Sequence, residues 1–274
     1  MAIKLLVLDI DGTIAGDNNQ IRKPVKLAIK AAQKQNIKVT LATGRMYRSA
    51  LPYYEQIETK LPLIAYNGAW IQNPDTQEKE HLPIGKEIAL ELLDYFESPA
   101  MNSYFGVHCY LEDQLYVKEI TPSTQEYAER SQVAAIPVGD LRKILQVNPT
   151  KVLAIAHKPQ MIKKCFPELK TRYSREKVHL TQSSHNLLEA MHPQVNKGKA
   201  VQYLAEKVLG IKPTEVMAIG DNFNDLEMLQ YAGVSIAMGS APDEIKKVAH
   251  WVAPDVEADG VAVAINKFLE KQNY

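Results

Sequence analysis

Two aspartates, one residue apart, follow the first apolar run of the chain. The sequence there reads LLVLDIDGT, which places Asp9, Asp11 and Thr13 directly after a candidate strand. Because alternate residues leaving a strand point the same way, the two carboxylates can address one substrate. One can attack as a nucleophile while the other moves protons. An isolated Asp-Gly pair is usually a turn, but its position at the end of a buried strand favours chemistry here.

A second acidic cluster follows a later apolar run. Residues 220–225 read GDNFND, so that Asp221 and Asp225 share one turn with two amides. Carboxylates crowded in this way repel one another unless a cation or a substrate network relieves them. Hard oxygen ligands of this kind suit Mg²⁺. The alternative is an ordinary helix start, in which Asp225 stabilises the helix dipole.

A hydroxyl and an ammonium group complete the set of candidates. Thr43, Gly44 and Arg45 end another apolar run, where a hydroxyl and free backbone amides at a helix start can bind an anion. Lys197 lies in the segment NKGKA, also at a predicted helix start. Taken singly, Thr43 is typical of a helix cap and Lys197 of a solvated surface.

These residues need a scaffold that brings distant segments together. Mainly apolar runs at 3–8, 39–42 and 216–219 are each followed by a helical pattern, which is typical of parallel strands buried on both faces. The strands therefore predict a doubly wound α/β sheet of Rossmann-like type, whose carboxyl edge binds ligands. The sequence predicts helices over 23–35, 49–59, 197–209, 224–231 and 260–271.

The middle of the chain has a different pattern. Helical stretches alternate there with paired strand-like runs joined by short turns, which indicates an α+β domain inserted into the first. We therefore expect a core over 1–83 and 193–274 and an α+β cap over 84–192. The expected helices span 85–96 and 158–171, and the expected strand pairs are 104–110 with 114–118 and 177–182 with 187–191.

The order DxDGT, TGR, KG and GDxxND resembles that of the haloacid dehalogenase superfamily, and within it the Cof-like phosphatases with a large α/β cap. The resemblance covers nearly the whole chain, including the segment around Asn67 and Asp259 to Val261 before the last helix. It implies a phosphatase acting on a small phosphorylated metabolite, most simply a sugar phosphate, with the cap selecting the substrate.

The resemblance also implies a role for each candidate residue. Asp9 attacks phosphorus, and Asp11 protonates the leaving group and then activates water, while Thr43 and Lys197 hold phosphoryl oxygens. Mg²⁺ is held by Asp9, the backbone carbonyl of Asp11 and Asp221, with Asp225 orienting the metal shell. Residues expected to contact the substrate are Thr13, Gly44, Arg45, Asn67 and Asn224.

Two other functions fit the same residues. A phosphosugar mutase similar to the phosphomannomutases would return the phosphoryl group to a sugar rather than to water. A binding protein could instead use an inactive site to sense a phosphometabolite. The second is disfavoured because a phosphate receptor gains nothing from two carboxylates that repel its ligand.

The composition restricts the partners. The 274 residues carry 32 basic and 32 acidic side chains, so no net charge attracts nucleic acid or an anionic membrane. The first apolar run is too short for a signal peptide or a membrane span, which favours a cytoplasmic protein. Cys109 and Cys165 have no CxxC neighbour and are expected to be reduced structural thiols, and the oligomeric state stays open.

Overall fold

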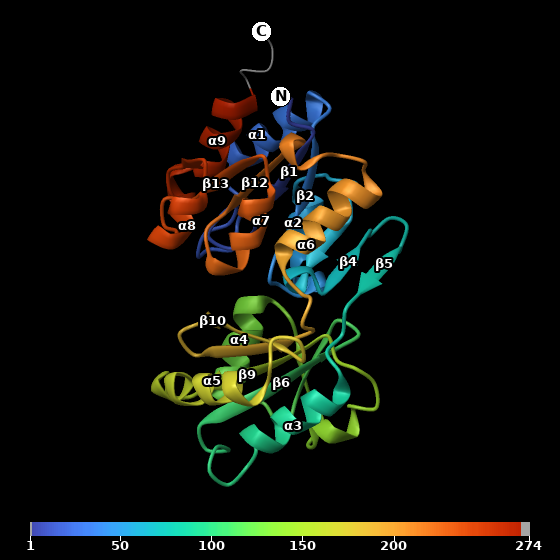
Figure 1. Ribbon diagram of the computed structural model, residues 1–274, viewed down its shortest axis with the longest axis vertical. Coiled ribbons are helices and arrows are strands. Elements are labelled where there is room, and N and C mark those ends of the chain that lie inside the picture. Colours follow the sequence, from blue (N-terminus) through green and yellow to red (C-terminus); the bar gives the residue numbers. More distant parts are fainter. Residues whose placement is uncertain (1, 270–274) are drawn as a thin grey trace. The chain divides into compact units, whose positions relative to one another are not determined.

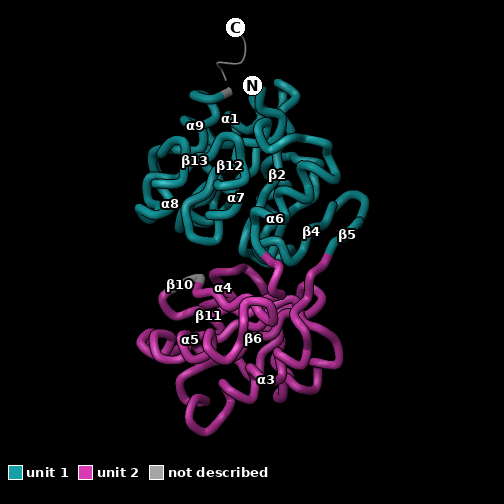
Figure 2. Tube along the Cα trace, viewed as in Figure 1, with its two compact units in different colours: residues 1–80, 196–274 teal, residues 81–195 magenta. Residues whose placement is uncertain are grey.

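The structure is a computed structural model that describes residues 2–269, and it divides into two compact units (Figure 2). The first unit contains the chain up to Glu80 and again from Asn196 onward, and the second contains His81–Val195. Each junction lies three residues from the expected boundary. The role of the second unit as a cap stays a prediction.

A five-stranded parallel sheet forms the centre of the first unit (Figure 1). Its order is β14-β13-β12-β1-β2, so strands distant in sequence are neighbours. Because β1 lies between β12 and β2, the segments after these three strands meet at one edge. The strands are β1 (Leu5–Leu8), β2 (Lys38–Leu41), β12 (Val216–Gly220), β13 (Val234–Ala237) and β14 (Trp251–Val252).

Helices of the first unit pack on this sheet through apolar side chains. Leu5 and Val7 share one buried cluster with residues of three helices, α6, α7 and α8. Leu6 and Leu8 point to the opposite face because side chains alternate along a strand. The helices are α1 (Lys23–Lys34), α2 (Tyr47–Gln56), α6 (Lys197–Gln202), α7 (Leu226–Tyr231), α8 (Asp243–Val248) and α9 (Gly260–Leu269).

A small antiparallel sheet follows the helix α2. It has the order β3-β4-β5, with β3 (Leu63–Ala65), β4 (Trp70–Gln72) and β5 (Lys79–His81). A single parallel bridge between Ala42 and Ile64 joins β3 to the end of β2. This bridge places the turn after β3 beside the loop that contains Thr43.

The second unit is built on a six-stranded sheet of order β10-β11-β9-β6-β7-β8. Its pairs are antiparallel except for β7 with β8. The strands are β6 (Phe105–Leu111), β7 (Gln114–Val117), β8 (Ala135–Pro137), β9 (Lys151–Ala156), β10 (His179–Ser184) and β11 (Leu187–Met191).

The two faces of this sheet have different contacts. One face packs against α3 (Lys86–Phe96) and α5 (Gln160–Arg172) through a continuous apolar cluster. The other face meets α4 (Pro122–Ser131) through polar contacts, in which the hydroxyl of Tyr110 donates to Tyr127 over 2.9 Å. Buried Lys151 donates to Glu189 over 3.1 Å on that same face.

The α/β fold class with a parallel core sheet is confirmed, whereas several element predictions were incomplete. The strand β9 at the centre of the second sheet was not predicted from the sequence, because two alanines and a lysine weaken its strand signal. The elements α4, α8, β13 and β14 were not predicted either. The predicted helix at 197–209 changes to a π-helical turn after Gln202, and α2 begins two residues before the expected start. Lys271, the expected end of the last helix, lies outside the described residues.

Candidate active site

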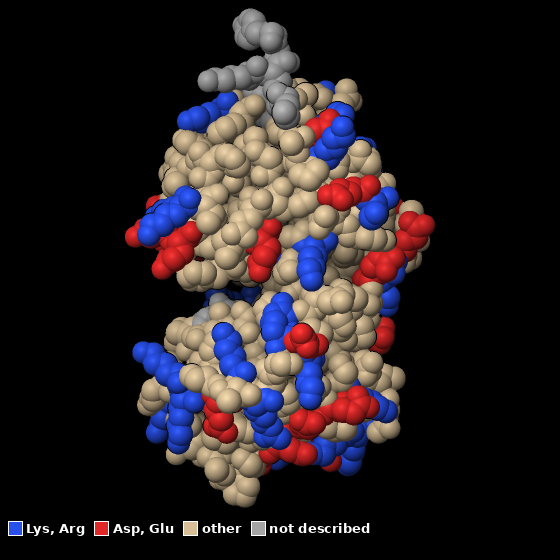
Figure 3. Space-filling model, in the orientation of Figure 1, with Lys and Arg blue, Asp and Glu red and all other residues tan. Residues whose placement is uncertain are grey.

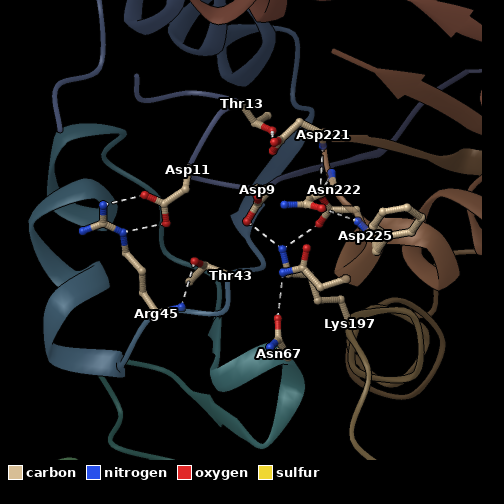
Figure 4. Close-up of polar contacts among 12 residues, drawn as sticks. Asp9, Asp11, Thr13, Thr43, Arg45, Asn67, Lys197, Asp221, Asn222 and Asp225 are labelled. Carbon is tan, nitrogen blue, oxygen red and sulfur yellow. Dashed lines mark hydrogen bonds and ion pairs between the residues drawn. The ribbon is translucent and has the colours of Figure 1, made fainter. Parts of the chain in front are cut away.

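The side chain of Lys197 connects two separate acidic segments at the sheet edge (Figure 4). Its ammonium group donates to Asp9 Oδ1 over 2.7 Å and to Asp225 Oδ1 over 2.6 Å. Lys197 begins α6, and its side chain has no exposed surface. A lysine at a helix start is ordinarily solvated, so full burial between two carboxylates marks it as part of the site.

A third carboxylate completes the cluster. One ligand oxygen from each of Asp9, Asp221 and Asp225 lies within 4.8 Å of the others. Thr13 is buried, and its hydroxyl donates to Asp221 Oδ1 over 2.9 Å. In this structure Thr13 therefore orients an acidic side chain, and its predicted contact with the substrate stays a prediction.

Burial and mutual repulsion shift the protonation of this cluster. Burial first, and then the charge of Asp225, raise the pKa of Asp9 well above its ordinary value. The same two causes raise the pKa of Asp221 to about 7. Burial alone would lower the pKa of Lys197, but the charges of Asp225 and Asp9 outweigh it and raise that pKa. Three carboxylates thus share one ammonium, and this excess of negative charge fits a divalent cation.

Asp225 is fixed by the turn that carries it. Its Oδ2 accepts the backbone N–H groups of Asp221 and Asn222 over 2.9 and 3.0 Å, while its Oδ1 accepts from Lys197. Both oxygens are therefore engaged within the protein. This arrangement suits a residue that positions the Asp221 loop and Lys197 more than one that binds a metal directly.

The loop after β2 is tied to the turn after β3 and to the loop after β12. The backbone N–H of Asn67 donates to the carbonyl of Thr43 over 2.8 Å, and Asn224 Nδ2 donates to Asn67 Oδ1 over 2.9 Å. A Cβ at Gly44 would lie 3.1 Å from Asn67 Oδ1, so glycine permits this approach. The hydroxyl of buried Thr43 accepts the N–H of Arg45 over 3.1 Å and keeps its own hydrogen for donation.

The turn that carries Asn67 has a left-handed backbone. Tyr66, Asn67 and Gly68 have φ values of 50°, 56° and 96°, and a left-handed backbone is uncommon for residues other than glycine. A Cβ at Gly68 would lie 2.8 Å from the backbone oxygen of Asn196, the N-cap of α6. The turn thus touches the helix start that positions Lys197.

We expect Gly68→Ala to lower the free energy of unfolding by about 2 kcal/mol more than Gly210→Ala. Both glycines have a positive φ, but a Cβ at Gly210 has no atom within 4 Å. The difference between the variants therefore isolates the clash with α6. Urea unfolding followed by circular dichroism measures it, and equal losses would contradict the close contact.

Asp11 lies apart from the three-carboxylate cluster and is paired with Arg45 (Figure 4). Arg45 Nε donates to Asp11 Oδ2 over 2.9 Å, and Arg45 Nη2 donates to Asp11 Oδ1 over 2.6 Å. Substrate contact was predicted for Arg45 from the sequence, but its pairing with Asp11 was not, since spacing in the chain does not report which side chains meet. That substrate contact stays a prediction.

Charge around the site is local. Figure 3 shows basic and acidic side chains together on the visible face of each unit, in keeping with the zero net charge of the chain. The field of the whole protein therefore does not attract an anion, and an anionic ligand must be held by local groups. Among residues 2–269, no helix is both long enough and apolar enough to cross a bilayer.

Relatives share this chain's full extent. A Haemophilus influenzae protein is 31% identical over 273 residues, covering 98% of this chain and 100% of that protein. The 5-amino-6-(5-phospho-D-ribitylamino)uracil phosphatase YitU of Bacillus subtilis is 27% identical, with 97% of each chain covered. The crystal structure of a haloacid dehalogenase-like hydrolase from Bacteroides thetaiotaomicron superposes with a TM-score of 0.87 at 26% identity, covering 97% of this chain and 99% of that one.

The family profile agrees with these similarities. The profile of the haloacid dehalogenase-like hydrolases matches residues 6–265, which includes every element that carries a site residue. The resemblance drawn from the motifs is thereby confirmed. The chain belongs to the haloacid dehalogenase-like hydrolase family.

Proposed function

We propose that this protein is a Mg²⁺-dependent phosphatase of small phosphomonoesters that works through an aspartyl phosphate on Asp9. The observation that carries the proposal is the position of Lys197, whose buried ammonium joins Asp9 to Asp225 beside Asp221. The name of the Bacillus subtilis relative specifies a phosphoribityl compound, which supports a sugar or polyol phosphate as the substrate class.

The acidic cluster suits Mg²⁺ because its three carboxylates have only one ammonium to balance them. Asp9, Asp221 and the backbone carbonyl of Asp11 would hold the ion, with Asp225 supporting them. When bound, the ion would offset the repulsion between a carboxylate and a phosphate dianion, which amounts to several kcal/mol in a partly desolvated site.

Two steps then follow from the residues of the chain. A carboxylate oxygen of Asp9 forms a bond to phosphorus as the bond to the leaving oxygen breaks, and Asp11 gives that oxygen its proton. In the second step Asp11 takes a proton from water as the water attacks phosphorus. The bond to Asp9 breaks, which restores its carboxylate and releases phosphate. Lys197 and Thr43 would hold phosphoryl oxygens in both steps.

A panel of phosphorylated metabolites with released phosphate as the readout tests the proposal, in Mg²⁺ and after chelation. We expect release from at least one sugar or polyol phosphate, and its loss on chelation. An isomerised hexose phosphate without free phosphate would favour a mutase. No Mg²⁺-dependent release across the panel would contradict an enzymatic function and favour a binding protein.

The pH dependence of stability provides an independent check on the acidic cluster. Since the pKa of Asp221 is raised to about 7, the folded protein favours its neutral form. Asp221 therefore contributes stability that is fully present below its ordinary pKa of 3.8. This contribution is lost as the pH rises through about 7. In the metal-free protein, Asp221→Asn should therefore raise the melting temperature more at pH 8 than at pH 4.

Mg²⁺ should raise the melting temperature of the unsubstituted protein at pH 8 and have little effect on Asp221→Asn. Calorimetry over pH 4 to 8, with and without Mg²⁺, measures both differences. Parallel curves for the two proteins would show that Asp221 is not perturbed as described.

A further inference from the structure

Arg45 is the more rigid partner of the pair that it forms with Asp11. The side chain of Arg45 is 9% exposed, whereas that of Asp11 is 55% exposed. Arg45 Nη2 also donates to Asn19 Oδ1 over 2.6 Å, and its guanidinium lies 4.8 Å from the ring centre of Tyr53. Asp11 is therefore an exposed carboxylate held by a largely buried cation.

The backbone of Arg45 anchors it to the loop that carries Thr43. Its N–H donates to Thr43 Oγ1, and its carbonyl accepts the N–H of Tyr66 over 2.9 Å. The guanidinium position is thus linked to the loop that carries Thr43. A bidentate pair fixes the direction of a carboxylate as well as its distance, which a single ammonium contact does not.

The pair also restricts what Asp11 can do. Both carboxylate oxygens of Asp11 accept N–H groups of Arg45. An oxygen that accepts in this way does not hold a proton between itself and the guanidinium. To give a proton to a leaving oxygen, Asp11 must loosen at least one of these bonds. Without Arg45, an exposed aspartate would sample many rotamers, and small misplacement of a reacting group costs large factors in rate.

We propose that Arg45 is the positioning residue of Asp11, holding this carboxylate at the edge of the site between its two proton transfers. The proposal rests on the proposed phosphatase function, because only then does Asp11 transfer protons. It predicts that replacing Arg45 lowers kcat/KM most for substrates whose leaving group depends most on protonation. Arg45 would then act through Asp11 rather than by direct contact with the phosphoryl group.

Two aryl phosphates of similar shape test this dependence. Nitrophenolate leaves readily as an anion, whereas phenolate needs protonation more. The ratio kcat/KM reports on substrate binding and formation of the phosphoenzyme and not on its hydrolysis. We expect Arg45→Met to lower kcat/KM for phenyl phosphate by about tenfold more than for 4-nitrophenyl phosphate. Arg45→Lys keeps the charge but not the bidentate geometry, so its losses on the two esters should differ by less than those of Arg45→Met. Equal losses on both substrates would overturn the proposal.

A double-mutant cycle separates an indirect role from direct phosphate binding. In an Asp11→Asn background, Arg45→Met should have no further effect on the single-turnover release of nitrophenolate. Direct contact between Arg45 and phosphate would leave its full effect in that background and overturn the proposal. A faster rate in Arg45→Met would also overturn it, since the pair would then be inhibitory.

Asn19→Gly provides a variant that leaves both partners in place. Asn19 has a φ of 57°, which glycine adopts without strain, and its side chain accepts from Arg45. We expect Asn19→Gly to lower kcat/KM for phenyl phosphate by about two- to fivefold more than for 4-nitrophenyl phosphate. If the unsubstituted protein hydrolyses neither ester, the proposed function fails. The other outcome is that the unsubstituted protein hydrolyses both esters and each variant, Asn19→Gly or Arg45→Met, lowers kcat/KM by the same factor for the two esters. In that case only the positioning role fails.

Discussion

Asp9→Asn is expected to abolish phosphate release, by at least about 10⁴-fold in kcat, while leaving the protein folded. An amide does not attack phosphorus, and asparagine has nearly the same shape as aspartate. Burial raises the pKa of Asp9 well above its ordinary value, and Lys197 keeps Asp225 as its second partner, so the neutral variant should remain folded. Phosphate release and trapping of the phosphoenzyme by acid quench measure the effect.

Asp17→Asn is the matched control, because Asp17 is exposed in the loop after the same strand. It should retain full activity. Ready turnover by Asp9→Asn, or a trapped phosphoenzyme in that variant, would contradict covalent catalysis by Asp9.

Lys197→Met is expected to lower the free energy of unfolding by about 3 to 5 kcal/mol at pH 8, the cost of leaving buried charges without their partner. Asp9 and Asp225 are both buried and both accept hydrogen bonds from this ammonium. Methionine fills a similar volume, so the loss reports the charge more than a cavity. The loss should be smaller at pH 5 than at pH 8, because the raised pKa of Asp9 favours its neutral form as the pH falls.

Lys199→Met on the same helix provides the comparison. Lys199 is exposed, and its replacement should change stability by no more than about 0.5 kcal/mol. Urea unfolding at the two pH values measures both variants. A loss in Lys197→Met as small as that in Lys199→Met would show that the buried ion pairs do not stabilise the fold.

Elements with a strong local signal could be predicted from the sequence. The strand that precedes Asp9 and the strand that ends at Gly220 were found because an unbroken apolar run followed at once by acidic residues is typical of a buried parallel strand that ends at a polar edge. In the second unit, β9 was missed because it begins with a lysine and its two alanines carry little strand preference.

The residues of the candidate site were also named from sequence, but their contacts were not. Motif order indicated that Asp9, Thr43, Lys197 and Asp221 belong together, and the structure places Lys197 between two of the acids. Contacts such as that of Thr13 with Asp221 span more than two hundred residues of chain. No local pattern reports a contact over such a separation.

The sequence by itself determined which chemical groups this protein carries at the ends of its core strands, because strand runs and the residues that follow them are contiguous in the chain. Only the tertiary structure decided that Lys197 is buried rather than solvated and that Asp11 is directed toward Arg45. Burial and ion pairing depend on which segments meet across the fold. Those meetings are set by the packing of the whole sheet and its helices, and no single segment encodes them.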